Sequence, residues 1–206
     1  MQQTSFWARR VHSLTGVVPI GAFLLEHLFS NSYSVQGPEA YNGMVEKLQG
    51  LPYVLWMEVF IIFLPILFHA IYGIYIAYQA KLNVVQYPMF RNWMFTLQRF
   101  TGIFLFAYVG MHVWETRLQV YFVEGIEHRF FEHMKDLLSN PGVFAFYVLG
   151  VISAAFHFAN GLWTFGIVWG FTAGRNAQRM SSLACGGLGI LVAGMGINSL
   201  LGFFQH

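Results

Sequence analysis

Cysteine is almost absent from this sequence, which has only Cys185 among 206 residues. A disulfide framework, a cysteine-rich zinc site and an iron–sulfur cluster each need several cysteines, so this chain alone can form none of them. The Cys-x-x-Cys-His run that attaches c-type haem covalently is also missing. Any haem would therefore be held by coordination and packing, as b-type haem is.

Charged residues are also scarce, since Asp, Glu, Lys and Arg make up 10% of the chain while hydrophobic residues make up 56%. Soluble domains carry about a quarter charged residues. A chain this apolar needs lipid to cover the surface that it cannot bury. The net charge of +2 is too small to indicate a nucleic-acid partner. No cleavable signal sequence is expected, because the first apolar run contains Pro19, Glu26 and His27 and no small-residue cleavage site follows it.

Five apolar stretches are long enough to cross the hydrocarbon core, which takes roughly 20 helical residues. They lie near residues 12–31, 53–80, 95–120, 142–171 and 182–204. The sequence thus predicts an all-α integral membrane protein with one transmembrane domain over 1–206, in which the first four helices form a bundle. The connections at 37–52 and 124–142 have the pattern of short interfacial helices. In the second connection, the residues expected to face the membrane are Phe130, Phe131, Met134, Leu137 and Leu138.

Basic residues predict the orientation, because they concentrate in cytoplasmic segments. One side of the predicted bundle is basic and has no acid; it carries Arg9, Arg10, Lys81, Arg91, Arg99, Arg175 and Arg179. Every Asp and Glu falls in the other half. The N-terminus is therefore expected inside. A basic inner surface suits a soluble partner with an acidic face, although attraction to anionic lipid explains it more simply.

An ionisable side chain inside the bilayer is costly, so its presence suggests a function. His27, His69, His112 and His157 lie one on each of the first four predicted helices. A single histidine there could simply hydrogen-bond to a neighbouring helix, and only the set of four argues further. At 1.5 Å per residue, His27 and His112 both lie roughly 20 Å from the inner surface, and His69 and His157 both lie roughly 22 Å below the outer surface. His27 and His112 are thus far from the inner surface and form an outer pair. His69 and His157 are far from the outer surface and form an inner pair.

Two imidazoles at one level, from different helices, suit a haem that takes one axial nitrogen on each face. Zinc would be short of its usual four ligands with two nitrogens per level. The sequence therefore predicts two haems b, one per histidine pair. Gly73 and Gly161 each follow an inner histidine by one helical turn, where a haem edge could pack, although close helix packing also uses glycine.

The two helix pairs look internally related. Residues 68–73 parallel residues 156–161, and Thr-Gly at 15–16 parallels Thr-Gly at 101–102, with one residue's difference in the spacing to the next histidine. A duplicated helix pair would naturally give two stacked cofactor sites. Short matches in apolar sequence also arise easily.

Two haems at different depths need an electron acceptor, and the simplest one in a membrane is a quinone. Quinone reduction consumes protons, so a carboxylate beside the site is expected. Glu26 and Glu58 are acids well within the apolar stretches, and both lie toward the outer side. Glu58 is favoured over Glu26 for the proton route. For each, a structural carboxylate at the interface is the alternative.

Basic residues at the inner boundary could bind propionates of the inner haem. The candidates are Arg9, Arg10 and Arg99, although positive-inside topology alone would place arginines there. His12, beside the first two, could touch a propionate or merely mark the interface.

His128 and His133 lie five residues apart in the outer connection, a spacing that does not put both on one helix face. They are expected to be solvated.

Four segments, at 9–27, 57–81, 90–117 and 156–170, follow one another in an order that is specific as a set. They resemble the cytochrome b558 subunit of succinate dehydrogenase in Bacillus-type bacteria. The likeness covers the first four predicted helices and much of their connections. It includes polar and aromatic residues that hydrophobicity alone would not specify.

The resemblance implies a five-helix anchor with two haems b, bound to a flavoprotein subunit and an iron–sulfur subunit on the cytoplasmic side of a bacterial cell membrane. It implies that His27 with His112 hold an outer, low-potential haem, and that His69 with His157 hold an inner, high-potential haem. Electrons from succinate would pass through the partner chains, the inner haem and the outer haem to menaquinone, whose site is expected near the outer haem. This chain would carry no succinate-oxidising residues.

The resemblance therefore favours the electron-transfer subunit of a succinate:menaquinone oxidoreductase. A fumarate reductase anchor working in the opposite direction is a close alternative. From other classes, a transporter or proton channel with a histidine relay and a purely structural anchor remain open.

Overall fold

The computed structural model describes residues 2–123, 125–126 and 129–206, and within these residues the chain is helical and has no strand. In the described part of the chain, five helical stretches are long and apolar enough to span a membrane: Ser5–Gln36, Val54–Gln79, Phe90–Tyr121, Pro141–Val168 and Arg175–Gly202. They overlap the five predicted stretches. The first and third extend beyond the prediction at both ends, the second lies within it, and the fourth and fifth begin and end earlier. The predicted fold class, an all-α protein with five spans, is confirmed.

The first two spans are each divided. The first comprises α1 (Gln2–Val17), α2 (Pro19–Asn31) and the 3-10 turn η1 (Ser32–Gln36). The second comprises α4 (Val54–Met57), the π-helical η2 (Glu58–Phe63) and α5 (Leu64–Gln79). Pro19 interrupts the first span because proline has no main-chain N–H to donate and favours the first position of a helix.

The remaining spans are α6 (Phe90–Val113) with the π-helical η3 (Trp114–Leu118) and the 3-10 turn η4 (Gln119–Tyr121), then α8 (Pro141–Val168), then α9 (Arg175–Gly202). Two short helices, α3 (Pro38–Gln49) and α7 (Phe130–Leu138), lie in the connections. In α8, the side chain of Asn140 caps the helix by accepting hydrogen bonds from the main-chain N–H groups of Gly142 and Val143.

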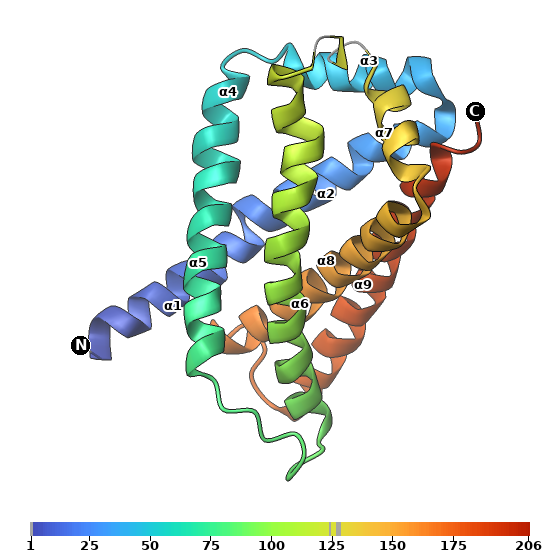
Figure 1. The fold of residues 1–206 in the computed structure, drawn as a ribbon. Coiled ribbons are helices and arrows are strands. Elements are labelled where there is room, and N and C mark those ends of the chain that lie inside the picture. Colours follow the sequence, from blue (N-terminus) through green and yellow to red (C-terminus); the bar gives the residue numbers. More distant parts are fainter. Residues whose placement is uncertain (1, 124, 127–128) are drawn as a thin grey trace.

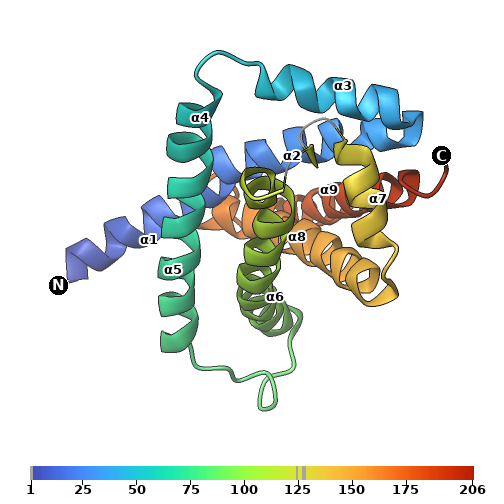
Figure 2. The same ribbon diagram turned by 45° about the horizontal axis from the view of Figure 1, so that its top comes forward.

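Figure 1 shows α3, α7 and the C-terminus at one end of the bundle and the connection from α5 to α6 at the opposite end. We call these the outer end and the inner end, after the orientation that the basic residues predict. Figure 2 shows α3 crossing the outer end, and α8 and α9 side by side along the bundle.

The apolar face of α7 lies inside the protein. Phe130, Phe131, Met134 and Leu138 belong to a buried cluster with residues of α3, α6, α8 and α9, and the Phe131 side chain is 1% exposed. The prediction that this face lies against the membrane was wrong. The same amphipathic pattern fits a helix on lipid and a helix on other helices, and here α7 covers the outer end of the bundle.

Candidate functional site

The outer histidine couple consists of His27 on α2 and His112 on α6. Their ring centroids are 5.6 Å apart and the ring planes are inclined by 77°. The phenol oxygen of Tyr147 on α8 lies 3.4 Å from His112 Nδ1. The amide nitrogen of Asn31 lies 3.4 Å from the His27 ring nitrogens and donates a 2.7 Å hydrogen bond to the His27 main-chain oxygen. Side chains from three helices therefore surround this couple.

The inner histidine couple consists of His69 on α5 and His157 on α8. Their ring centroids are 6.3 Å apart and the ring planes are inclined by 80°. His69 Nδ1 lies 3.0 Å from the main-chain oxygen of His12, and His157 Nδ1 lies 3.1 Å from Thr101 Oγ1. An imidazole whose Nδ1–H is donated to such an acceptor presents its Nε2 lone pair to a metal.

The ring separation in each couple is close to that of two imidazoles bound to one metal atom. Two imidazoles on one metal have centroids roughly 6 Å apart, because each metal–nitrogen bond is about 2 Å long and the centroid lies about 1 Å behind the nitrogen. The separations of 5.6 Å and 6.3 Å agree with this value. Among the described residues no three His, Cys, Asp or Glu side chains converge on one point. Two nitrogens suit a haem, since the porphyrin supplies the other four ligands.

The structure thus brings together the same two histidine pairs that were predicted from their depths along the helices.

A fifth histidine lies beside the inner couple: the ring of His12 stacks on His69 with centroids 4.1 Å apart and planes inclined by 10°. Parallel rings at this distance leave no space for a metal between them. His12 is therefore a neighbour of a candidate ligand, and its Nε2 is buried and has no hydrogen-bond partner among the described residues.

The two halves of the inner couple are built alike, and two glycines make this possible. A Cβ placed on Gly16 would lie 2.6 Å from His69 Cε1, and one on Gly102 would lie 3.0 Å from His157 Cε1. The Thr-Gly repeat seen in the sequence therefore has a structural counterpart, with each Thr-Gly pair facing one inner histidine. The difference in spacing to the outer histidines coincides with the interruption at Pro19, which the second repeat lacks.

Gly73 and Gly161 are also equivalent in the repeat, but they face other side chains. A Cβ on Gly73 would lie 3.1 Å from His12 Nε2, and one on Gly161 would lie 3.5 Å from Gln98 Nε2. Gly73 thus makes room for His12, and Gly161 makes room for Gln98. His12 and Gln98 are themselves equivalent in the repeat, since each lies three positions before its threonine. Their contact with a haem edge stays a prediction.

The two candidate carboxylates have different surroundings. Glu58 on η2 is half-buried and accepts a 2.8 Å hydrogen bond from Arg117 Nη2 on η3. Glu26 is exposed and accepts a 2.5 Å hydrogen bond from Ser30 Oγ on its own helix. Sequence reasoning missed Arg117 as a partner, although it is one of the few basic residues in the acidic half of the chain.

The three inner arginines are engaged to different degrees. Arg9 Nη2 donates a 3.2 Å hydrogen bond to Gln79 Oε1, and the guanidinium of Arg10 lies over the rings of Phe6 and Trp169. Arg99 donates from Nη1 to the Phe95 main-chain oxygen at 2.8 Å, while its Nε is buried without a partner among the described residues. Of these three arginines, Arg99 is therefore the one with a buried N–H donor that has no partner among the described residues.

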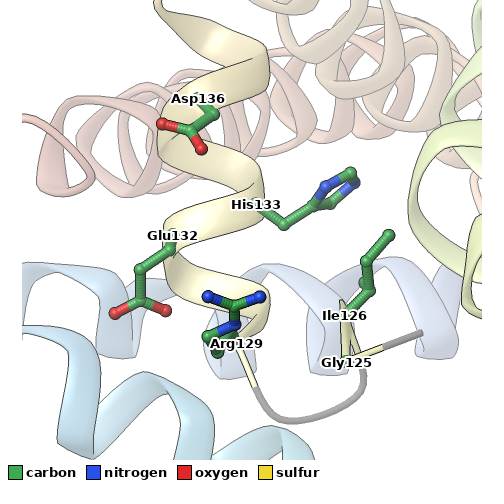
Figure 3. A pocket seen from close by; sticks show the side chains of 6 residues that line it. All are labelled: Gly125, Ile126, Arg129, Glu132, His133 and Asp136. Carbon is green, nitrogen blue, oxygen red and sulfur yellow. The ribbon is translucent and has the colours of Figure 1, made fainter. Parts of the chain in front are cut away.

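A polar pocket of about 160 Å³ lies at the outer end, on α7 (Figure 3). Its lining includes the exposed carboxylates Glu132 and Asp136 and the half-buried His133. His133 Nε2 lies 2.8 Å from the main-chain oxygen of Glu115, so this histidine ties α7 to η3 and is less solvated than predicted. His128 lies outside the described residues.

Comparison with known proteins places these features in context. The family profile described as "Succinate dehydrogenase/Fumarate reductase transmembrane subunit" matches residues 77–196, which include one histidine of each couple. The chain is also 42% identical over 198 residues to the succinate dehydrogenase cytochrome b558 subunit of Bacillus subtilis (strain 168), and the alignment covers 96% of both chains.

Proposed function

Because the chain belongs to the succinate dehydrogenase/fumarate reductase transmembrane-subunit family, we propose that it is the membrane-anchor haem subunit of a succinate:menaquinone oxidoreductase. The protein is a multi-pass protein of the bacterial cell membrane, with residues 1–206 as one transmembrane domain and its N-terminus inside. It receives electrons from a flavoprotein and an iron–sulfur subunit at the inner end and delivers them to menaquinone near the outer end. The observation that carries the proposal is the arrangement of four imidazoles, from four spans, in two couples.

Two haems b are the proposed cofactors. Haem b, when bound, supplies a reversible one-electron change at its iron. His27 and His112 would hold the outer group, and His69 and His157 the inner group. The hydrogen bonds at both inner Nδ1 atoms support this assignment, because they leave each Nε2 free to coordinate.

Residues at the inner end support two further parts of the proposal, the binding of a haem propionate and the docking of the partner subunits. The unpartnered, buried Nε of Arg99 supports a contact with a haem propionate there, with Arg9 and Arg10 at the same boundary as further candidates. The connections at this end carry basic residues and no acid, which favours an acidic face on the iron–sulfur or flavoprotein partner.

Residues at the outer end support the proposal that a quinone is reduced there. Reduction of a quinone to a quinol takes two electrons and two protons, so an acid–base group at the site is required. We infer that Glu58 serves the proton route and that its partner Arg117 belongs to the same site. Glu26 is the weaker candidate, since its side chain is exposed and its partner Ser30 lies on its own helix, whereas Glu58 is half-buried and contacts a second span.

The family description also names fumarate reductase. An anchor of this kind would serve that reaction equally well, because the direction follows from the partner subunits and the redox potentials. Copurification with a succinate-oxidising flavoprotein, assayed in both directions, separates the two cases.

The proposal is tested by the haem content of the purified complex. We expect b-type bands after dithionite reduction and two haems per chain. His69→Ala and His157→Ala should each remove the inner haem, and His27→Ala and His112→Ala the outer one, while His133→Ala keeps both. A colourless wild-type preparation, or equal haem loss in the His133 control, would contradict the proposal.

A further inference from the structure

The two inner histidines differ in what accepts their Nδ1–H hydrogen bond. His69 Nδ1 lies 3.0 Å from the main-chain oxygen of His12, with Thr15 Oγ1 further away at 3.4 Å. His157 Nδ1 lies 3.1 Å from Thr101 Oγ1, which within the described part of the chain is its only hydrogen-bond partner. The first half of the repeat thus uses a main-chain carbonyl where the second half uses a side-chain hydroxyl.

The hydroxyl of Thr101 is oriented by its own helix. Its proton is donated back to the main-chain oxygens of Leu97 at 2.8 Å and Gln98 at 3.2 Å. Such back-bonding is common for threonine within a helix. Because the proton is engaged there, the oxygen presents its lone pairs to the ring of His157 and must accept from it. The contact therefore specifies the tautomer with the proton on Nδ1.

The same helix brings this hydroxyl within reach of the ring. Gly102 follows Thr101, and its missing side chain lets the His157 ring approach α6 so closely that an added Cβ would lie 3.0 Å from Cε1. In the first half, Gly16 plays this part for His69, but there Thr15 donates to the His12 oxygen at 2.9 Å and the ring bonds to that same oxygen directly. Loss of the Thr15 hydroxyl would leave the His69 acceptor in place.

We propose that Thr101 is a positioning residue for the inner haem: its hydroxyl fixes the rotation and tautomer of His157, whereas the equivalent Thr15 is dispensable for His69. This proposal rests on the haem function proposed above. An acceptor at Nδ1 makes an imidazole a stronger ligand and favours the more highly charged ferric iron. Removing the acceptor at His157 raises the potential of the inner haem.

The experiment compares Thr101→Val with Thr15→Val in the complete complex. Valine keeps the shape of threonine and removes the hydroxyl, so the two variants are matched and differ only in which half of the repeat they change. Thr101→Ser, which keeps the hydroxyl, serves as the rescue. The readouts are haem content, the low-spin ferric EPR signals and redox titration of both haems, with the outer haem as the internal reference.

We expect Thr101→Val to shift the ferrous-to-ferric ratio of the inner haem about tenfold toward ferrous at fixed potential, which is about 59 mV for one electron. Thr15→Val and Thr101→Ser should stay within about twofold of wild type, and the outer haem should not change. An unchanged inner haem in Thr101→Val, or an equal shift in Thr15→Val, overturns the proposal.

If Thr101→Val loses the inner haem altogether, Thr101→Ser decides the matter. Retention of the inner haem in the serine variant supports the hydroxyl, and its loss there overturns the proposal in favour of simple packing. Failure of the haem function itself appears separately, as a wild-type complex without b-type bands.

Discussion

Arg117 and Glu58 join the third and second spans at the outer end through two hydrogen bonds to one carboxylate oxygen. Arg117 Nη2 lies 2.8 Å and Nε 3.2 Å from Glu58 Oε2. The side chains are only 26% and 18% exposed, and both residues lie in π-helical turns, which occur frequently at functional sites. Glu58 is therefore held in one place by its partner, and any role at the quinone belongs to the pair.

Glu58→Gln should lower menaquinone reduction at least about tenfold while both haems are retained, because the amide keeps the shape but cannot carry a proton. The rate is measured in membranes with succinate as donor, together with the haem content. Glu39→Gln, on the exposed face of α3, is the control and should behave as wild type. Normal quinone reduction in Glu58→Gln would remove Glu58 from the proton route.

Gly102→Ala should damage the inner haem site, since its Cβ would lie 3.0 Å from His157 Cε1 and the ring would have to move. Gly110 on the same helix provides a matched control, because nothing lies within 4 Å of a Cβ there. Alanine in a helix is favoured over glycine by roughly 0.5–1 kcal/mol, so Gly110→Ala should be neutral or stabilising. The readout is the inner haem per chain. Equal haem content in the two variants would show that the ring adapts.

The spans and the histidine pairs could be predicted because both follow from fixed helical geometry. A rise of about 1.5 Å per residue converts sequence spacing into depth, so His27 and His112, and likewise His69 and His157, fall at common levels. Which side chain an ionisable residue meets depends on helix rotation, and here the π-helical turns change that rotation. This is why the partner of Glu58 was not predicted.

The contacts of the Thr-Gly repeat could not be predicted either. Thr-Gly at 15–16 and 101–102 was visible in the sequence, but its contact with the inner histidines was not, because each pair faces a different helix of the bundle. Likewise, the amphipathic pattern predicted α7 as a helix, but could not tell lipid from protein as the partner of Phe131.

Arg99→Gln should lower the potential of the inner haem and leave the outer one unchanged. A positive charge near a haem favours the reduced form, and its loss should change the free energy of reduction on the order of 1 kcal/mol. Redox titration of membranes measures both haems at once. Arg91→Gln is the control, since Arg91 donates a 2.5 Å hydrogen bond to Gln178 away from the buried position of Arg99. A potential shift of the same size in both variants would show that the effect comes from general surface charge and not from a contact of Arg99 with the haem.

Gly202→Ala should destabilise the outer end of the bundle without touching either histidine couple. A Cβ there would lie 2.5 Å from Ser34 Oγ and 2.7 Å from the main-chain nitrogen of Val35, and main-chain atoms cannot rotate away. Ser34 is completely buried and donates a 2.7 Å hydrogen bond to the main-chain oxygen of Ser199, so α9 and η1 would have to separate. Overpacking of this kind costs about 1–3 kcal/mol.

The measurement is thermal unfolding of the purified complex, with haem content recorded before heating. Gly194→Ala, on the same helix and with open space around its Cβ, should unfold at or above the wild-type temperature. Both variants should keep two haems per chain at low temperature, because the atoms that clash belong to Ser34 and Val35 and not to either histidine couple. If Gly202→Ala unfolds like Gly194→Ala, the close approach of α9 to Ser34 does not stabilise this end of the protein.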